Sequence, residues 1–488
     1  MKISKLIEGM TITHSADGDL EVSGIAQDSR KIEPGDLFVA LVGQRYDGRA
    51  FVGDALEQGA VGVLSSGPAP SGYQGAWLQT DDPRRMMSVL ASRLYDRPDR
   101  KLLVVGVTGT NGKSTISHLM AVILEASDKP TGTLGTLGYS FGGEHLPVQH
   151  TTPESTELFE LLGRMEKAGA EAVCLEVSSH ALALGRVQDV AFDLAIFSNL
   201  TRDHLDFHRN FEDYFAAKRR LFDQLKPGGV CAVNVDDPFG RRLAQSLSSA
   251  VTFGEGGDVH AGRIEFTIEG TRGVLLTPRG ELEFSCNLLG AYNLENILAA
   301  VAGAVALGAS PQAIREGLSS IRPLAGRMEA IDRGQPFPVI VDYAHTDAAL
   351  EAALQSIRSI SSRKVLLVFG CGGDRDPGKR QLMGQVAGKL ADLSIITSDN
   401  PRFEDPLAII ASIEEGLQQS GNPNYRILPD RREAIRRAIS QADERWAILV
   451  AGKGHEEAQI VGERQVPFSD REEIETILEE RFGSRAGN

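Results

Sequence analysis

The sequence predicts an α/β protein of three domains, and three observations indicate this class. Short apolar runs typical of buried strands alternate with helix-like segments along most of the chain. One such run, ending near Val107, leads into a glycine-rich loop and a helical segment. The 488 residues are too many for one hydrophobic core. We therefore expect a small N-terminal α/β domain (1–99), a central P-loop ATPase-like parallel sheet (100–330), and a C-terminal Rossmann-like doubly wound sheet (331–488).

In the N-terminal domain, residues 37–41 and 61–64 are predicted strands, with a short helix over 51–58 between them. Asp28, Ser29 and Arg30 precede the turn Glu33-Pro34-Gly35-Asp36. These three can bind a sugar or phosphate, with arginine as a charge-assisted donor. A capped turn with a surface salt bridge explains the pattern equally well. Residues 95–100, charged and containing Pro98, are interpreted as a linker.

The central domain opens with the strand 102–107 and the loop Gly109-Thr110-Asn111-Gly112-Lys113-Ser114-Thr115, followed by a helix over 116–126. Glycines let backbone N–H groups approach a phosphate, and the helix N-terminus favours negative charge. Lys113 can reach the β- and γ-phosphates, and Ser114 can ligate Mg²⁺. The full P-loop pattern has glycine where this chain has Val107, so the loop is a shorter form. An exposed lysine in a simple turn is less favoured, and we expect an enzyme that uses a nucleoside triphosphate.

Two further strand ends of the central domain carry candidate ligands. Glu176 interrupts the apolar strand 172–177, which is costly unless the carboxylate is paired or binds a metal. A Mg²⁺ ligand and a buried salt bridge are both consistent with it. After the strand 193–198, two His and two Asp follow within six residues, from Asp203 to His208. This segment is either a second metal or phosphate cluster or a solvated loop.

The rest of the central domain is less informative. Residues 211–225 are a predicted amphipathic helix carrying Lys218, and a lone helical lysine is usually solvated. Residues 251–284 indicate β-hairpins. Asn293 and Asn296 precede a helix over 297–307 and are as easily helix caps as ligands.

In the C-terminal domain, four predicted strands end in polar residues. They are 339–341, 365–369, 394–396 and 446–451, and the residues that follow them include Asp342, Arg375, Asp399 and Glu456. Binding groups collect at the carboxyl ends of parallel strands, so we expect a ligand crevice there.

Composition bounds the function. The formal net charge of −15 argues against nonspecific binding to nucleic acid or an anionic membrane. Four cysteines, far apart, indicate buried thiols in a reducing compartment. No secretory h-region and no run of 18 apolar residues is found, so we expect a cytoplasmic protein.

Taken together, these motifs resemble those of the Mur ligases, ATP-dependent amide-bond-forming enzymes of cytoplasmic peptidoglycan precursor synthesis. Each motif alone is weak, but all occur in the family's order over essentially the whole chain. They are Asp28–Arg30, Gly109–Thr115, Thr151–Pro153, Glu176–His180, Asn199–His204, Gly290–Asn296, Gly326–Arg327, Asp342–Thr346 and Asp399–Arg402. The type that the chain resembles most adds the third amino acid to UDP-N-acetylmuramoyl-L-alanyl-D-glutamate.

The resemblance implies a role for each matching position. The uridine diphosphate end would contact Ser29, Gln44, Arg45 and Tyr46. The muramoyl dipeptide would contact Thr151, Thr152, Ser178 and Arg186. ATP would bind Gly109–Thr115 and would also contact Asn296, Arg327 and Asp342. The catalytic residues would be Lys113, Lys218 and His204. Mg²⁺ would be held by Ser114, Glu176 and His204, and a second Mg²⁺ by Lys218 once carbamylated.

The motif Asp399-Asn400-Pro401-Arg402 resembles that of family members adding meso-diaminopimelate. Arg402 can bind the second carboxylate of that amino acid bidentately, whereas lysine would leave it unpaired. The resemblance adds Arg375, Gly452 and Glu456 as further contacts, with Glu456 suited to the distal ammonium. Two departures are Leu184, where some members have a contacting glutamine, and Asp347, where a proline is common.

Alternatives from the sequence are a lysine-adding member, a MurF-type ligase, a folylpolyglutamate synthase and a nucleotide-binding regulator without catalysis. A folylpolyglutamate synthase lacks a unit like residues 1–99, and the intact Lys113, Glu176 and Lys218 argue against the regulator. We expect small-molecule substrates only, no nucleic-acid or membrane partner, and a monomer.

Overall fold

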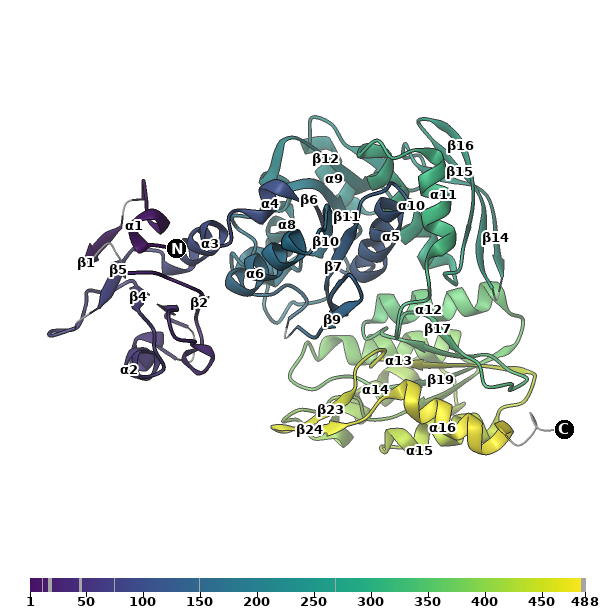
Figure 1. Ribbon diagram of the computed structural model, residues 1–488. Coiled ribbons are helices and arrows are strands. Elements are labelled where there is room, and N and C mark those ends of the chain that lie inside the picture. Colours follow the sequence, from purple (N-terminus) through teal and green to yellow (C-terminus); the bar gives the residue numbers. More distant parts are fainter. Residues whose placement is uncertain are drawn as a thin grey trace. The chain divides into compact units, whose positions relative to one another are not determined.

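The computed structural model describes residues 1–10, 12–15, 20–43, 46–73, 75–148, 150–267 and 269–483. The chain forms two compact units. The first contains Met1–Thr108, Asp128–Ile196 and Ala217–Cys231, and the second contains Gly109–Ser127, Phe197–Ala216 and Ala232–Asn488. The three predicted domain ranges remain a prediction. The mixed α/β class with parallel sheets is confirmed (Figure 1).

The N-terminal sheet has the strand order β1-β5-β4-β3-β2. Strands β2 to β5 pair in parallel and β1 pairs antiparallel with β5. Phe38, Val63 and Trp77 of this sheet form a core with Val52 and Ala55 of helix α2. The elements are α1 Ile3–Leu6, β1 Thr13–Ser15, β2 Ile25–Ala26, the 3₁₀ helices Ser29–Lys31 and Gly48–Phe51, β3 Leu37–Ala40, α2 Val52–Glu57, β4 Gly62–Ser65, β5 Ala76–Gln79 and α3 Pro83–Leu94.

The predicted linker at 95–100 is wrong. A short helix, α4 (Pro98–Lys101), begins there with Pro98 in its first turn. Asp99 is fully buried, and its carboxylate accepts a hydrogen bond from the backbone N–H of Ala191 at 3.1 Å. Proline is well tolerated at the first helical position, which explains why a helix begins at Pro98.

The central sheet has the order β13-β12-β11-β6-β10-β7-β8-β9. Strand β10 pairs in parallel with both β6 and β7, which explains why its residues 172–175 form an apolar run. Gly106 in β6 is required because a Cβ there would overlap the ring of Phe192. The elements are β6 Leu103–Thr108, α5 Lys113–Glu125, β7 Thr131–Gly135, β8 Gly138–Phe141, β9 Glu144–Leu146, α6 Ser155–Lys167, β10 Ala172–Glu176, α7 Ser179–Ala183, β11 Phe192–Phe197, α8 Phe211–Arg219, β12 Leu225–Asn234, α9 Pro238–Ser246 and β13 Val251–Phe253.

Two expectations for this region need adjustment. The helix predicted over 211–225 ends at Arg219, because Phe222–Gln224 is a 3₁₀ turn and β12 begins at Leu225. Of the residues predicted as hairpins, β13 pairs in parallel with β12 instead. The remainder forms the antiparallel meander β14 His260–Thr267, β15 Gly270–Thr277 and β16 Gly280–Cys286, followed by α10 Ala291–Ala306 and α11 Pro311–Ser320.

The C-terminal sheet has the order β17-β18-β22-β19-β20-β21, parallel except for β17. Helices α12, α13 and α14 share one core with the sheet, and α15 and α16 share another with its opposite face, so the doubly wound prediction is confirmed. The elements are β17 Glu329–Ile331, β18 Val339–Asp342, α12 Asp347–Ile360, β19 Lys364–Phe369, α13 Gly378–Leu390, β20 Leu393–Ile396, α14 Pro406–Gln419, β21 Tyr425–Ile427, α15 Arg431–Gln441, β22 Trp446–Ala451, β23 Ala458–Val461, β24 Arg464–Pro467 and α16 Asp470–Phe482.

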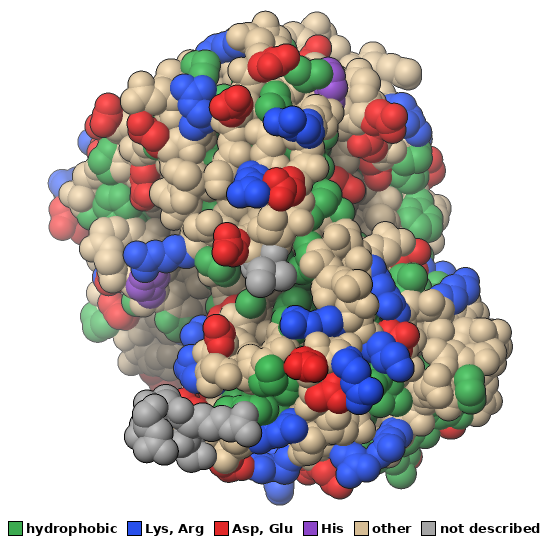
Figure 2. All heavy atoms as spheres, turned by 90° about the vertical axis from the view of Figure 1, so that its right-hand side faces the viewer, with side chains coloured by type: hydrophobic (Ala, Val, Ile, Leu, Met, Phe, Trp, Pro, Cys, Tyr) green, Lys and Arg blue, Asp and Glu red, His purple; other side chains and the backbone are tan. Residues whose placement is uncertain are grey.

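Surface and core agree with the compositional expectations. All four cysteines are buried free thiols. Over the described ranges, every helix is too short or too polar to cross a bilayer. On the face drawn in Figure 2, basic and acidic side chains are interspersed.

Candidate active site

The glycine-rich loop joins β6 to the first turn of α5. Gly112 is the residue before the helix and has a φ of +89°. A side chain at Gly112 would overlap Oδ1 of Asn296, so both the conformation and the space require glycine. The loop is held by Asn199, whose backbone oxygen accepts from Thr110 N–H and whose Oδ1 accepts from Asn111 N–H, each at 2.9 Å. The N-terminal N–H groups of α5 are thereby fixed as an anion site.

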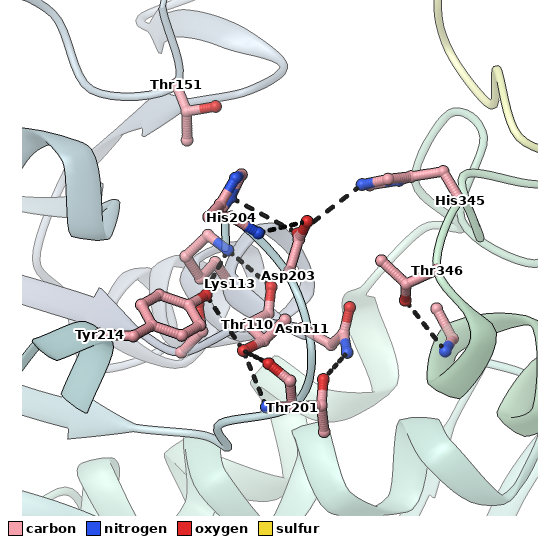
Figure 3. A network of polar contacts seen from close by, with 12 residues as sticks. Thr110, Asn111, Lys113, Thr151, Thr201, Asp203, His204, Tyr214, His345 and Thr346 are labelled. Carbon is pink, nitrogen blue, oxygen red and sulfur yellow. Dashed lines mark hydrogen bonds and ion pairs between the residues drawn. The ribbon is translucent and has the colours of Figure 1, made fainter. Parts of the chain in front are cut away.

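Lys113 folds back over this loop. Its Nζ donates to the carbonyl oxygens of Gly109 at 3.0 Å and Thr110 at 2.9 Å (Figure 3). Thr110 Oγ1 lies 3.1 Å from the hydroxyl of Tyr214 on α8 and accepts from Thr201 N–H. The ammonium is therefore placed at the mouth of the loop, where it can exchange carbonyl partners for phosphate oxygens.

A cavity of about 250 Å³ lies within the second unit and begins at this loop. Three predicted ATP contacts from later in the chain, Asn296, Arg327 and Asp342, share its lining with the loop. Its lining comprises Asn111, Gly112, Ser114, Thr115, Asn199, Thr201, Tyr292, Glu295, Asn296, Arg327, Asp342, Tyr343, Ala344, His345, Ala348, Ala349 and Ala352. The lining combines polar side chains with three alanines of α12, which suits a ligand with a charged and a flat apolar part.

Arg327 connects the loop to the C-terminal sheet. Its Nη2 donates to Ser114 Oγ at 3.2 Å, and its guanidinium lies 4.7 Å from the centre of the Tyr343 ring. Asp342 accepts hydrogen bonds from the Tyr292 hydroxyl and the Met328 N–H on Oδ2, at 3.0 and 2.7 Å. Burial raises the pKa of Asp342, and the charge of Arg327 opposes that shift. The two hydrogen bonds thus hold the Asp342 carboxylate in one position.

Asn296 does not cap α10. The residue before that helix is Gly290, which has no side-chain capping hydrogen bond. Asn296 Nδ2 donates to Asn293 Oδ1, and Asn293 Nδ2 donates to the Leu289 carbonyl, both at 2.8 Å. Of the two interpretations from sequence, the helix cap is wrong for these residues, and Asn296 lines the cavity.

The polar segment after β11 brings Asp203, His204 and His345 together. His204 Nε2 lies 3.5 Å and His345 Nε2 4.0 Å from Asp203 Oδ2, as Figure 3 shows. Burial raises the pKa of Asp203, but the adjacent His204, His345 and Lys379 lower it overall. His204 has a φ of +54°, uncommon for a non-glycine residue. The segment therefore combines a polar cluster around Asp203 with exposed residues at Asp206 and Phe207.

In the first unit, Glu176 at the end of β10 is 1% exposed. Its Oε1 accepts from the Thr136 N–H at 2.8 Å and its Oε2 from the Thr136 hydroxyl at 3.0 Å. Within the described residues, Glu176 makes hydrogen bonds to Thr136 and no salt bridge. Thr136 was missed by the sequence analysis because nothing around it signals function.

The predicted muramoyl-dipeptide contacts surround Glu176. Thr151 Oγ1 lies 3.1 Å from Thr136 Oγ1, and Thr152 Oγ1 donates to the Glu176 carbonyl at 2.8 Å. Ser178 N–H donates to Thr152 Oγ1 at 3.0 Å. Arg186 donates to the Thr152 carbonyl at 3.1 Å and pairs with Glu154 at 2.9 Å. These contacts form one network next to Glu176, and the substrate contacts themselves stay a prediction.

Lys218 lies on α8 and is 1% exposed. The solvated lysine expected from a lone helical position is therefore wrong. An ammonium in such a position has lost its hydration, which is costly without compensation. Burial marks Lys218 as more than a surface residue.

The structure is consistent with both interpretations of the candidate binding residues in the N-terminal domain. Asp28 caps the 3₁₀ turn and pairs with the exposed Arg30 at 2.7 Å, which is the capped turn with a surface salt bridge. The same turn, with Ser29 and Tyr46, lines a cavity of about 560 Å³. Both interpretations therefore survive. Gln44 and Arg45 lie outside the described residues.

The C-terminal candidates meet at the ends of β20 and β22. Asn400 Nδ2 donates to Glu456 Oε2 at 2.7 Å. Arg402, with a φ of +52°, donates to the Gly373 carbonyl at 2.7 Å, and burial lowers its pKa. Gly452, with a φ of +119°, packs so closely on Asp399 that no side chain fits there. Pro401 is buried, and Arg375 is exposed on the neighbouring turn and donates to the Asp374 carbonyl.

Comparisons with known proteins find similarity over nearly the whole chain. Family models described as the Mur ligase family catalytic domain, the Mur ligase middle domain and the Mur ligase glutamate ligase domain match residues 21–95, 107–304 and 326–454. The UDP-N-acetylmuramoyl-L-alanyl-D-glutamate–2,6-diaminopimelate ligase of Geobacter metallireducens is 43% identical, covering 94% of this chain and 95% of that protein. The ligase of the same name from Syntrophomonas wolfei is 41% identical, covering 98% and 99%. A solved structure of a ligase with that name superposes with a TM-score of 0.69 at 33% identity, covering 99% of each chain.

Proposed function

This chain belongs to the Mur ligase family, and we propose that it adds meso-2,6-diaminopimelate to UDP-N-acetylmuramoyl-L-alanyl-D-glutamate at the expense of ATP. The observation that supports this amino-acid substrate is the cluster of polar side chains that follows the ends of β20 and β22. There a half-buried arginine, Arg402, lies in the same cluster as a carboxylate, Glu456, held by Asn400. An amino-acid head group carries the complementary pair of charges.

The reaction consistent with these parts has two stages. The γ-phosphate of ATP transfers to the γ-carboxylate of the D-Glu residue, which releases ADP and gives an acyl phosphate. The amine of diaminopimelate attacks the acyl carbon, loses a proton, and displaces inorganic phosphate to leave an amide. The chain needs no nucleophile of its own, and its work is positioning and charge neutralisation. Lys113 supplies positive charge at the transferring phosphoryl group.

Asn296, Arg327 and Asp342 are proposed to hold ATP in the 250 Å³ cavity with residues 109–115. The alanines of α12 offer an apolar wall for the base, and Asn111, Gly112 and Ser114 the polar end for the phosphates. Thr151, Thr152, Ser178 and Arg186 are proposed to bind the dipeptide, and Ser29 and Tyr46, with Gln44 and Arg45, the uridine diphosphate. The cytoplasm, where the three substrates would be available, is the proposed location, and a monomer the proposed state.

Mg²⁺ is proposed as the cofactor. Among the described residues, no group of three or more His, Cys, Asp and Glu side chains is arranged to hold a metal ion. Proteins usually bind Mg²⁺ through a few side chains together with phosphate oxygens and water. Ser114, Glu176 and His204 are the side chains proposed to hold it. When bound, the ion would neutralise charge on the transferring phosphate.

Carbamylation of Lys218 is proposed on its burial and on the family resemblance. The neutral amine would add to CO₂ and release one proton, which converts a buried cation into an anion able to ligate a second Mg²⁺. Carbon-13 NMR of protein equilibrated with labelled bicarbonate should show a carbamate signal that is absent from the Lys218→Ala variant. A spectrum without such a signal in the active enzyme would exclude the modification.

The proposed function is tested by phosphate release with ATP, Mg²⁺ and the UDP-muramoyl dipeptide, comparing meso-diaminopimelate with L-lysine. Strong release with meso-diaminopimelate alone is expected. A site built around a polar partner rejects an analogue lacking that partner by roughly 10⁴-fold in kcat/KM. The Arg402→Met variant should lose most of this preference. Equal release with lysine would remove the specificity argument, and no release with either would favour the regulator or another ligase substrate.

A further inference from the structure

Lys453 is a fully buried lysine that the proposed function does not use. It lies two residues after β22, in the segment Ala451-Gly452-Lys453-Gly454-His455-Glu456, and its side chain is 0% exposed. Burying an ammonium is costly unless all its N–H groups are hydrogen-bonded and its charge is paired. A lysine retained in such a place needs a specific reason.

The contacts of Lys453 satisfy that requirement. Its Nζ donates to Asn400 Oδ1 at 3.1 Å, Glu456 Oε2 at 2.9 Å and the Ala458 carbonyl at 2.6 Å. An ammonium has three N–H donors, and all three are used. Glu456 supplies the opposite charge. Two of the three partners are residues already proposed to bind the amino-acid substrate.

These contacts fix the orientation of the Asn400 amide. Oδ1 accepts from Lys453 and also from the Ile460 N–H at 3.0 Å, while Nδ2 donates to Glu456 Oε2 at 2.7 Å. A flipped amide would place an NH₂ group against the Lys453 ammonium and the Ile460 N–H. One N–H of Asn400 takes part in no contact among the described residues.

The same contacts fix Glu456. Both Lys453 and Asn400 bind its Oε2, and the side chain is 30% exposed. No contact of Oε1 is recorded within the part of the chain that the structure describes. The carboxylate is therefore anchored by one oxygen and retains the other for an external cation.

From this geometry we infer that Lys453 is a positioning residue for the amino-acid substrate. It sets the Asn400 amide and the Glu456 carboxylate so that an N–H and a carboxylate oxygen are presented together. That pair is complementary to the carboxylate and ammonium of an amino-acid head group. Lys453 itself, enclosed by these partners, acts through them. The inference rests on the proposed function and extends its amino-acid site.

The test is steady-state kinetics of Lys453→Met in the full-length enzyme, with each substrate varied in turn. Without the ammonium, Glu456 and Asn400 can adopt other rotamers, so KM for meso-diaminopimelate should rise at least tenfold. KM for ATP and for the UDP-muramoyl dipeptide should stay within about twofold, since truncating a buried charge partner acts locally. Lys389→Met, at an exposed lysine on α13, is the matched control and should leave all three KM values unchanged.

Because Lys453→Met can fail to fold, Lys453→Gln is made alone and together with Glu456→Gln. Glutamine keeps one N–H donor, and a smaller rise in KM for diaminopimelate is expected. If Lys453 acts through Glu456, adding Lys453→Gln to Glu456→Gln should raise that KM little further. Full multiplication of the two effects, or equal rises in all three KM values, would overturn the inference. Wild-type enzyme inactive with diaminopimelate would instead overturn the proposed function.

Discussion

His455 shows how a single buried side chain makes stability depend on pH. Its Nδ1 is buried without a hydrogen-bond partner in the described part of the chain. Burial, and then the charges of Arg327 and Lys453, lower its pKa from 6.5 to about 4. Between those values the unfolded chain binds a proton that the folded chain does not, so stability falls as pH falls. The loss between pH 7 and pH 5 should be about 2 kcal/mol.

The measurement is the thermal midpoint of wild type and of His455→Asn at several pH values in this window. Asparagine does not titrate, so the variant should gain stability relative to wild type as the solution is acidified. A difference between the two proteins that stays constant from pH 7 to pH 5 would show that His455 protonates equally in both states.

For single residues, the sequence predicts which side chains can take part in the chemistry better than it predicts what surrounds them. Lys113 and Asp342 could be chosen because they stand at the ends of apolar strands or in a glycine-rich loop. The sequence could not predict the hydrogen bonds from Thr136 to Glu176, nor that Lys218 and Lys453 are buried. Each depends on residues distant in the sequence, and periodicity within one helix or loop carries no information about such partners.

Gly112 immediately precedes helix α5, and Asn296 of helix α10 leaves no room for a side chain at this position. Gly112→Ala should lower stability by about 1–3 kcal/mol, because alanine is strained at positive φ. It should also weaken ATP binding at least tenfold, since a Cβ would displace Asn296 from the phosphate loop. Gly169→Ala is the matched control. Gly169 has a φ of +95° but nothing within 4 Å of its Cβ position.

Calorimetric ATP binding and thermal unfolding of both variants separate strain from contact. Both should be less stable, and only Gly112→Ala should lose affinity. Unchanged affinity in Gly112→Ala would indicate that the loop tolerates displacement of Asn296.

The first turns of α15 and α16 are joined by a fully buried ion pair. Arg431 Nε and Nη2 donate to the two carboxylate oxygens of Asp470, each at 2.7 Å, and Nη2 also donates to the Ala451 carbonyl at 3.0 Å. Arg431→Met should lose about 3–5 kcal/mol of unfolding free energy, because Asp470 is left as an unpaired buried charge. Adding Asp470→Leu should restore part of that loss.

Denaturant unfolding of the two single variants and the double variant measures this coupling. A double variant as unstable as the sum of the single changes would contradict the buried-pair explanation. Since Ala451 immediately precedes the Gly452–Glu456 segment, a raised KM for diaminopimelate in Arg431→Met is also expected.

Elements with long, strongly periodic patterns were predictable, and their ends were not. The strands β18, β19, β20 and β22 lie where the apolar runs indicate. The helix expected over 211–225 ends at Arg219, and Leu225, the last residue of the expected helix, is the first residue of β12. Residues 95–100 were interpreted as a linker partly because they contain Pro98, although proline also fits well in the first turn of a helix. Local propensity permits both outcomes, and tertiary packing decides between them.

Over the whole chain, the ATP site joins stretches far apart in sequence. Within the second unit, one cavity is lined by residues of the glycine-rich loop together with residues much later in the chain: Asn111, Gly112, Ser114 and Thr115 with Asn296, Arg327, Asp342 and the alanines of α12. A ligand that binds only the folded arrangement raises the free energy of unfolding by about 2.7 kcal/mol at a concentration of 100 Kd. Mg²⁺ with ATP should therefore raise the thermal midpoint of the transition that unfolds this unit, and chelating the metal should remove much of the rise.

Lys113→Met, which lacks the phosphate-facing ammonium but keeps the volume of the side chain, should show a far smaller rise. Scanning calorimetry of both proteins, with and without nucleotide, decides the matter. An equal rise in the variant would mean that nucleotide stabilises the fold from some place other than the glycine-rich loop.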